Sequence, residues 1–369
     1  MQLLLDEAQT IGDPCADRLI ARLSKRGDLG AIDRAIGTLK DHSSELRANV
    51  PSGLRRFFKA EGMPAWADRA RILRAQRWIA QHPIATATAL FCAALPTAFT
   101  GAKGVAVLYA TGRLSNDVDR RVNETGRFVF DVLMPGSFES GRAVRSTQKV
   151  RLLHAVVRHR VRAGSRRGRR ANLPINQEEL LGTLTCFSIV VLDAFVRMGI
   201  PVREEDAADY LHLWCVVGAM LGIREDWLPG KLSTARALAS EIRARQGGTT
   251  AEGRALAAIL LDGIERHLPA RGLRVLGPGL MRLFLDEGTT RSLALPQGLL
   301  YRDLQQLLGL VSRRLTGVAT AVLPTLGRSL LEAAMQFKLG GREASFHTPL
   351  ATLRTPTTAA RCPYDRGSA

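Results

Sequence analysis

One histidine of this chain stands within an apolar helical stripe, which makes it the first residue to consider for chemistry. Positions 150, 153, 154, 157 and 161 recur at helical spacing, so His154 shares a helix face with Val150, Leu153, Val157 and Val161. We expect this face to be turned inward. A neutral imidazole in a core needs a hydrogen-bond partner or a metal, and histidine is a common ligand of iron and zinc. His154 is therefore either a satisfied core residue or a metal ligand, with haem iron as one candidate.

A second set of polar residues lies on the helix that we predict over residues 117–133, after the capping residues Ser115, Asn116 and Asp117. Arg121 and Thr125 share one face of it with Phe128 and Val132. Two interpretations are open. Either Arg121 extends to solvent and Thr125 bonds its own helix, or both side chains serve a site on this apolar face.

The charge of the chain is strongly basic, with 52 Lys and Arg against 34 Asp and Glu and a formal net charge of +18. Such a balance suits an acidic partner. The dense part of the excess is one arginine cluster, Arg158, Arg160, Arg162, Arg166, Arg167, Arg169 and Arg170. Because no aromatic residue that could stack on a base is interleaved, we interpret it as a solvated basic loop and expect no nucleic-acid partner.

The elements that must position these residues are helical. Alanine, leucine and arginine are abundant, alternating β-branched runs are scarce, and most apolar residues recur at helical spacing, so we predict an all-α fold. We expect one helical domain over 1–340 and a poorly ordered tail over 341–369. Five helical stretches can be delimited: a helix opened by 64–68, a buried helix pair over 84–111 broken at Pro96 and Gly101, and helices over 117–133, 180–198 and 204–221.

The segment before residue 180 carries a helix start signal. Asn176 is expected to be the N-cap, and Glu179 would complete a capping box.

Export and membrane insertion have little support in the sequence. Residues 1–7 carry three leucines followed by acidic residues, without a basic region, so we expect a cytoplasmic protein as written, or a secreted one if a leader was removed. The nearest approach to a membrane span is 84–99, which Pro96 interrupts, so no transmembrane segment is expected. The oligomeric state is not fixed by the sequence, and a monomer is favoured.

Taken together, these segments resemble the latex clearing proteins, the haem b rubber oxygenases of actinobacteria and other bacteria, and the wider oxygenase family around them. The resemblance covers most of the chain except the tail. The stretches that carry it are LRRFFKAEGMPAWAD (54–68), RVNET (121–125), VRLLHAVVRH (150–159), LPINQEEL (173–180), YLHLWCVVGAMLGIREDWLP (210–229) and residues 250–287.

This resemblance implies a globin-like helical core that binds haem b, with further helices around it. The family's proximal histidine lies in the motif R-x-x-HA-x-x-RH, which is matched here by residues 151–159, so His154 is implied as the iron ligand. Arg151 and Arg158 of the same motif are implied as cofactor-binding residues, with the haem propionates as partners. We expect His159 to face solvent or a propionate, and His212 to be a packed helix residue.

The distal side departs from the family pattern at two positions. The family's R-x-x-K-T motif is matched by 121–125, where Arg121 and Thr125 are retained and Glu124 replaces the lysine. The family's distal glutamate, a base on the substrate's allylic proton, aligns with Lys103. The resemblance thus implies Arg121, Glu124, Thr125 and Lys103 as the catalytic residues, with the two charges exchanged.

The function that this resemblance implies is oxidative cleavage of the double bonds of cis-1,4-polyisoprene by a haem b dioxygenase. O2 and a hydrophobic isoprenoid would be its partners, and oligo-isoprenoids with aldehyde and ketone ends its products. Two alternatives are a haem oxygenase or peroxidase acting on a small intracellular terpenoid or lipid, and a non-catalytic, basic helical binding protein.

Overall fold

The computed structural model describes residues 1–38, 50–60, 62–101, 104–105, 118–164, 173–248, 250–267 and 276–296, with the backbone alone over 118–124. In these ranges the regular structure is helical apart from one isolated bridge between Gly101 and Gly247, which confirms the all-α prediction. The first helices are α1 (Gln2–Ala8), α2 (Pro14–Lys25), α3 (Gly30–Thr38), α4 (Ser52–Ala60), α5 (Arg69–Ala80), α6 (Pro83–Ala89), the π-helix η1 (Leu90–Ala94) and α7 (Leu95–Ala98). They are followed by α9 (Val118–Leu133), α10 (Arg142–Gly164), α11 (Gln177–Thr185), the π-helix η3 (Cys186–Val190), α12 (Val191–Arg197), α13 (Glu204–Met220), η4 (Glu225–Trp227), α14 (Leu232–Gln246), α15 (Ala251–His267), α16 (Leu276–Phe284) and α17 (Glu287–Ser292).

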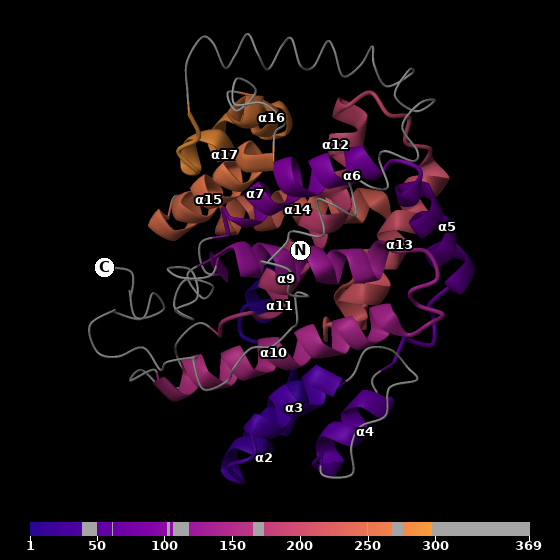
Figure 1. Cartoon of the computed structure of the whole chain (residues 1–369), viewed down its shortest axis with the longest axis vertical. Coiled ribbons are helices and arrows are strands. Elements are labelled where there is room, and N and C mark those ends of the chain that lie inside the picture. Colours follow the sequence, from indigo (N-terminus) through magenta and orange to yellow (C-terminus); the bar gives the residue numbers. More distant parts are fainter. Residues whose placement is uncertain are drawn as a thin grey trace.

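The long helix α10 forms a wall between two hydrophobic clusters. On one side it packs against α2, with α3 and α4 beside it, and on the other it contacts α9 and α13 (Figure 1). Leu152, Ala155 and Val156 of α10 are fully buried in the smaller cluster, which α2, α3 and α4 complete. Val144 and Val150 instead pack against the larger cluster. A helix with two apolar faces of this kind is held from both sides, so its rotation is set by packing.

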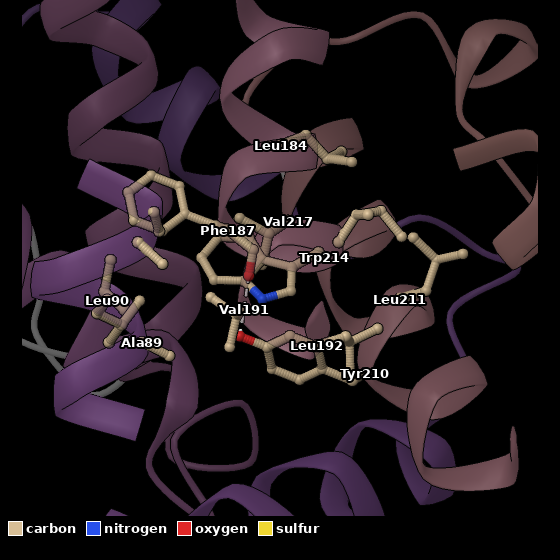
Figure 2. Close-up of a cluster of buried hydrophobic side chains, with 14 of the residues drawn as sticks. Ala89, Leu90, Leu184, Phe187, Val191, Leu192, Tyr210, Leu211, Trp214 and Val217 are labelled. Atoms are coloured by element: carbon tan, nitrogen blue, oxygen red, sulfur yellow. Dashed lines mark hydrogen bonds between the residues drawn. The ribbon is translucent and has the colours of Figure 1, made fainter. Parts of the chain in front are cut away.

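The larger cluster is centred on the continuous helix α11–η3–α12 and on α13, which packs along α5. Phe187 and Trp214 stack with ring centroids 5.2 Å apart, and the buried Tyr210 hydroxyl donates to the Phe187 carbonyl at 2.9 Å (Figure 2). The buried rings give this core its apolar area, and the bonded Tyr210 hydroxyl adds specificity.

Several predicted boundaries are confirmed by capping contacts. Asp68 is the N-cap of α5, where its Oδ1 accepts from the Ala70 and Arg71 amides. Asn176 caps α11 through the Glu179 amide at 3.0 Å. The return arm of the predicted capping box reaches one residue further than expected, because the Glu179 carboxylate accepts from the amide of Ile175 at 2.7 Å.

The predicted break at Pro96 is wrong, because the helix that begins at Pro83 continues to Ala98 through α6, η1 and α7. The π-turn explains this. The Leu95 amide bonds the Leu90 carbonyl, five residues back, so the wider turn relieves the clash of a proline ring with the preceding turn.

One described helix, Gln177–Arg197, is long and apolar enough to cross a membrane by length and composition. The sequence instead indicated residues 84–99 as the nearest approach to a membrane span. Because 78% of its apolar window is buried inside the protein, it serves as a core helix here. The expected helices beyond residue 296 and the tail over 341–369 lie outside the described residues, so the prediction of a single domain over 1–340 stays a prediction.

Candidate functional site

The stripe that contains His154, which we expected to face inward, is half-buried rather than fully buried. Leu152, Ala155 and Val156, on the neighbouring face, are the fully buried residues. The five stripe residues are each partly exposed. The reason is that α2–α4 cover the 152/155/156 face, whereas in the stripe Val150 packs against the larger cluster and Leu153 against the smaller one. The stripe is therefore neither buried in the core nor fully open to solvent.

His154 itself is half-buried, and its Nδ1 atom is buried. The exposed part of this residue therefore lies on atoms other than Nδ1. A haem iron needs only one such protein nitrogen as its axial ligand.

Helices α9 and α10 lie side by side and run in opposite directions (Figure 1). Near the turn that joins them, the buried Asp131 carboxylate accepts from the Ser146 hydroxyl. His154 lies eight residues after Ser146 on α10. Position 123 lies eight residues before Asp131 on α9. Since both helices rise equally per residue, the backbone of the 121–125 motif is level with His154.

The predicted distal residues are described to different extents. Thr125 is half-buried, one turn before the buried Phe128, and Val132 is fully buried. The backbones of Arg121 and Glu124 lie on α9, but their side chains are outside the described residues, as is all of Lys103. The exchange of charge between 103 and 124 therefore stays a prediction.

The two motif arginines have protein partners. Arg151 donates through Nε and Nη2 to both carboxylate oxygens of Asp13, the N-cap residue of α2. Arg158 is 1% exposed and donates to Asp17 Oδ1 at 2.7 Å and to the Ile175 carbonyl at 3.0 Å. The interpretation of Arg158 as part of a solvated basic loop is therefore wrong. Residues 166–170 of that cluster lie outside the described residues.

The other two histidines under consideration differ from each other. His159 is half-buried, and burial followed by the nearby Arg160 charge lowers its pKa. His212 is packed on α13 as expected, with Nε2 accepting from the Asp68 amide at 3.0 Å. Burial, then the Arg71 charge, lowers the pKa of His212, which suits an acceptor nitrogen.

Sequence reasoning missed Asp13, Asp17 and Gln177, because their roles depend on contacts between distant parts of the chain. Gln177 is fully buried, and its Nε2 donates to the carbonyls of Gly12 at 2.6 Å and Gly222 at 2.8 Å. The available signal was the position of Asp13 and Asp17 four residues apart at the start of a helix.

Within the part of the chain that the structure describes, no group of three or more His, Cys, Asp or Glu side chains is placed to hold a metal ion.

Comparisons with known proteins agree with this placement of elements. Residues 76–337 match the family described as ER-bound oxygenase mpaB/B′/rubber oxygenase, catalytic domain. The rubber oxygenase of Streptomyces sp. (strain K30) is 27% identical over 275 residues, which are 72% of this chain and 66% of that protein. The match thus spans just under two thirds of the relative's length. A solved structure of latex clearing protein LCP in the closed state superposes with a TM-score of 0.74 at 24% identity, covering 89% of this chain and 90% of that one.

Proposed function

Because the chain belongs to the oxygenase family that contains mpaB and rubber oxygenase, we propose that it is a haem b-dependent dioxygenase that cleaves an isoprenoid double bond. The observation that carries the proposal is the position of His154: a half-buried imidazole on α10, level with the 121–125 segment of α9. Haem, when bound, supplies an iron that binds and activates O2.

The residues near His154 suit such a group. The imidazole would hold the iron, and its buried Nδ1 would leave the other ring nitrogen for the metal. Phe128 and Val132 give α9 an apolar, buried flank. Exclusion of water and an apolar wall are what a hydrocarbon substrate requires of its site.

The distal groups are assigned by their resemblance to the family motif. Thr125 offers a hydroxyl on a half-buried turn, and Arg121 supplies a fixed positive charge on the same helix. Glu124 would be the base that accepts a proton from the allylic carbon of the substrate, with Lys103 as its counter-charge.

Rubber oxygenase, the name of the relative from Streptomyces, favours polyisoprene as the substrate class. The apparent exchange of Lys103 and Glu124 favours a second candidate, a small terpenoid or lipid in a differently charged pocket. A non-catalytic basic binding protein is disfavoured, because Arg158 is buried in an ion pair and the family is one of oxygenases.

The test supplies the purified protein with cis-1,4-polyisoprene latex and O2, and analyses the products by mass spectrometry. The proposal expects oligo-isoprenoids with one aldehyde and one ketone end, and none from His154→Ala. A haem protein that leaves latex intact but oxygenates a small terpenoid would support the second candidate. A protein without haem would contradict both.

A double variant tests the assignment of Lys103 and Glu124 to the substrate pocket. Exchanging the two charges in Lys103→Glu with Glu124→Lys restores the family pattern, so turnover should change, together with its dependence on pH. Unaltered turnover would show that these residues do not face the substrate.

A further inference from the structure

Two buried arginines bracket His154 on α10. Arg151 lies one turn before it and Arg158 one turn after it, on nearly the same side of the helix. Both are almost completely buried, at 7% and 1% exposure. A buried guanidinium is costly unless it is paired, so their partners define what these residues do.

Both partners come from α2. Asp13 binds Arg151 through both carboxylate oxygens, and Asp17, one turn further along, binds Arg158. The Asp13 Oδ1 atom also accepts the first amides of α2, from Cys15 at 3.2 Å and Ala16 at 3.1 Å. The same carboxylate therefore caps the start of α2 and binds α10. We refer to these two ion pairs as the α2–α10 clamp.

A glycine packs closely against each ion pair of the clamp. A Cβ atom on Gly222 would lie 2.3 Å from Asp13 Oδ2 and 3.0 Å from Arg151 Nε. On Gly12 it would lie 2.8 Å from Asp17 Oδ2 and 3.0 Å from the Arg158 side chain. The carboxamide of Gln177 donates to the carbonyl groups of both glycines, so one buried side chain links the two halves.

Four nitrogens of the two guanidinium groups bind the protein. Nε and Nη2 of Arg151 donate to Asp13, and Nε and Nη1 of Arg158 donate to Asp17 and the Ile175 carbonyl. The Nη2 atom of Arg158 is buried without a hydrogen-bond partner among the described residues. Because both side chains are almost completely buried and most of their donors bind the protein, the role of propionate partner that the family motif implied is disfavoured.

We propose that Arg151 and Arg158 are positioning residues, which fix the rotation and height of His154 on α10 through Asp13 and Asp17. This inference rests on the proposed function, in which His154 holds the haem. Two contacts on either side of a residue oppose both rotation of its helix about the helix axis and translation along that axis. The planar guanidinium group also restricts the orientation of each contact. Asp13 and Asp17 precede residues 76–337, so both carboxylates of the clamp lie outside the matched catalytic segment, whereas both arginines lie inside it.

The test uses Asp13→Asn and Asp17→Asn in the full chain. Asparagine caps a helix as well as aspartate does, so Asp13→Asn removes the charge and keeps the start of α2. Asp193→Asn is the control, because its pair with Arg236 at 2.6 Å is exposed on both sides. The readouts are the iron–histidine stretching band of the ferrous protein, the rate of haem transfer to apomyoglobin, and the melting temperature.

The clamp predicts a shifted stretching band and about 10–100-fold faster haem loss in both clamp variants, with the control unchanged. A lower melting temperature with an unchanged band and unchanged haem loss would reduce the ion pairs to general stabilisers and overturn the proposal. If Asp13→Asn does not accumulate as folded protein, Arg151→Lys provides the same comparison, since it keeps the charge but loses the two-point contact.

Failure of the proposed function is seen separately, as a wild-type protein that binds no haem. In that event hydrogen exchange of the amides of 150–158, in the protein as purified, decides on the clamp. Faster exchange of these amides in the clamp variants, but not in the control, supports the clamp. Equal exchange in wild type and in the clamp variants overturns it.

Discussion

His154 and His159 lie five residues apart on α10 and have different surroundings. His154 is flanked by the clamp and level with the α9 motif, whereas His159 lies near Arg160 and Asp17. The difference comes from position on the helix, because five residues turn a side chain through more than one full turn. The two histidines of one motif thus have separate surroundings, and a substitution at His159 is a matched control for one at His154.

Gly222 is a further residue whose identity the clamp dictates. Its φ is +91°, and a Cβ atom would collide with Asp13. Gly136 has a similar φ of +80° but open space around it. We expect Gly136→Ala to lower the free energy of unfolding by about 1–2 kcal/mol, the cost of the backbone alone. Gly222→Ala should cost clearly more in the same urea titration, and equal losses would mean that the ion pair relaxes freely.

At the scale of elements, the segment before α5 is held by a histidine acceptor. The amide of Asp68 donates to His212 Nε2, and Trp66 packs edge-on to the same imidazole with centroids 5.7 Å apart. The Trp66 indole in turn donates to Glu225 at 2.8 Å. These contacts place residues 66–68 against α13 and η4, and the bond to Nε2 requires an unprotonated imidazole.

Stability should therefore depend on pH through His212. Its pKa in the folded protein is below 6.5, so between that lowered pKa and 6.5 the unfolded chain binds more protons. The contribution of His212 is complete above pH 6.5 and declines as the pH falls through this window. His212→Gln should unfold with a weaker pH dependence than wild type in urea titrations from pH 7 to 5. Superimposable pH profiles would contradict the role given to Nε2.

Much of the helical framework could be predicted from local signals. The contacts between helices that are distant in the sequence could not. Asp68 and Asn176 are capping residues followed by apolar periodicity, and such signals act within four residues. The π-turn before Pro96 and the burial of Arg158 depend on packing against other helices. For the same reason His154 could be selected from its motif, while Asp13 and Asp17, more than 130 residues away, could not.

At the scale of the whole molecule, the N-terminal helices complete the wall that carries His154. They cover the apolar face of α10 formed by Leu152, Ala155 and Val156, and they supply both carboxylates of the clamp. The matched family segment begins at residue 76, after all of these contributions. The folded unit that presents His154 therefore includes α2, α3 and α4.

A fragment that begins at residue 62 tests this view. It lacks α2–α4, so it exposes three fully buried side chains of α10 and leaves two arginines without their carboxylates. We expect it to be recovered mainly as insoluble protein or to melt well below the full chain. A soluble fragment with the same melting temperature and the same haem content would show that the N-terminal helices are dispensable.

The central claim is that His154 holds the iron of a bound haem, and a cavity-rescue experiment tests it most directly. The visible spectrum is recorded for wild type, His154→Gly and His159→Gly, each with and without added imidazole. We predict a haem Soret band in wild type and in His159→Gly, its loss or displacement in His154→Gly, and its return when imidazole fills the vacated space. A spectrum of His154→Gly identical to that of wild type would contradict the account.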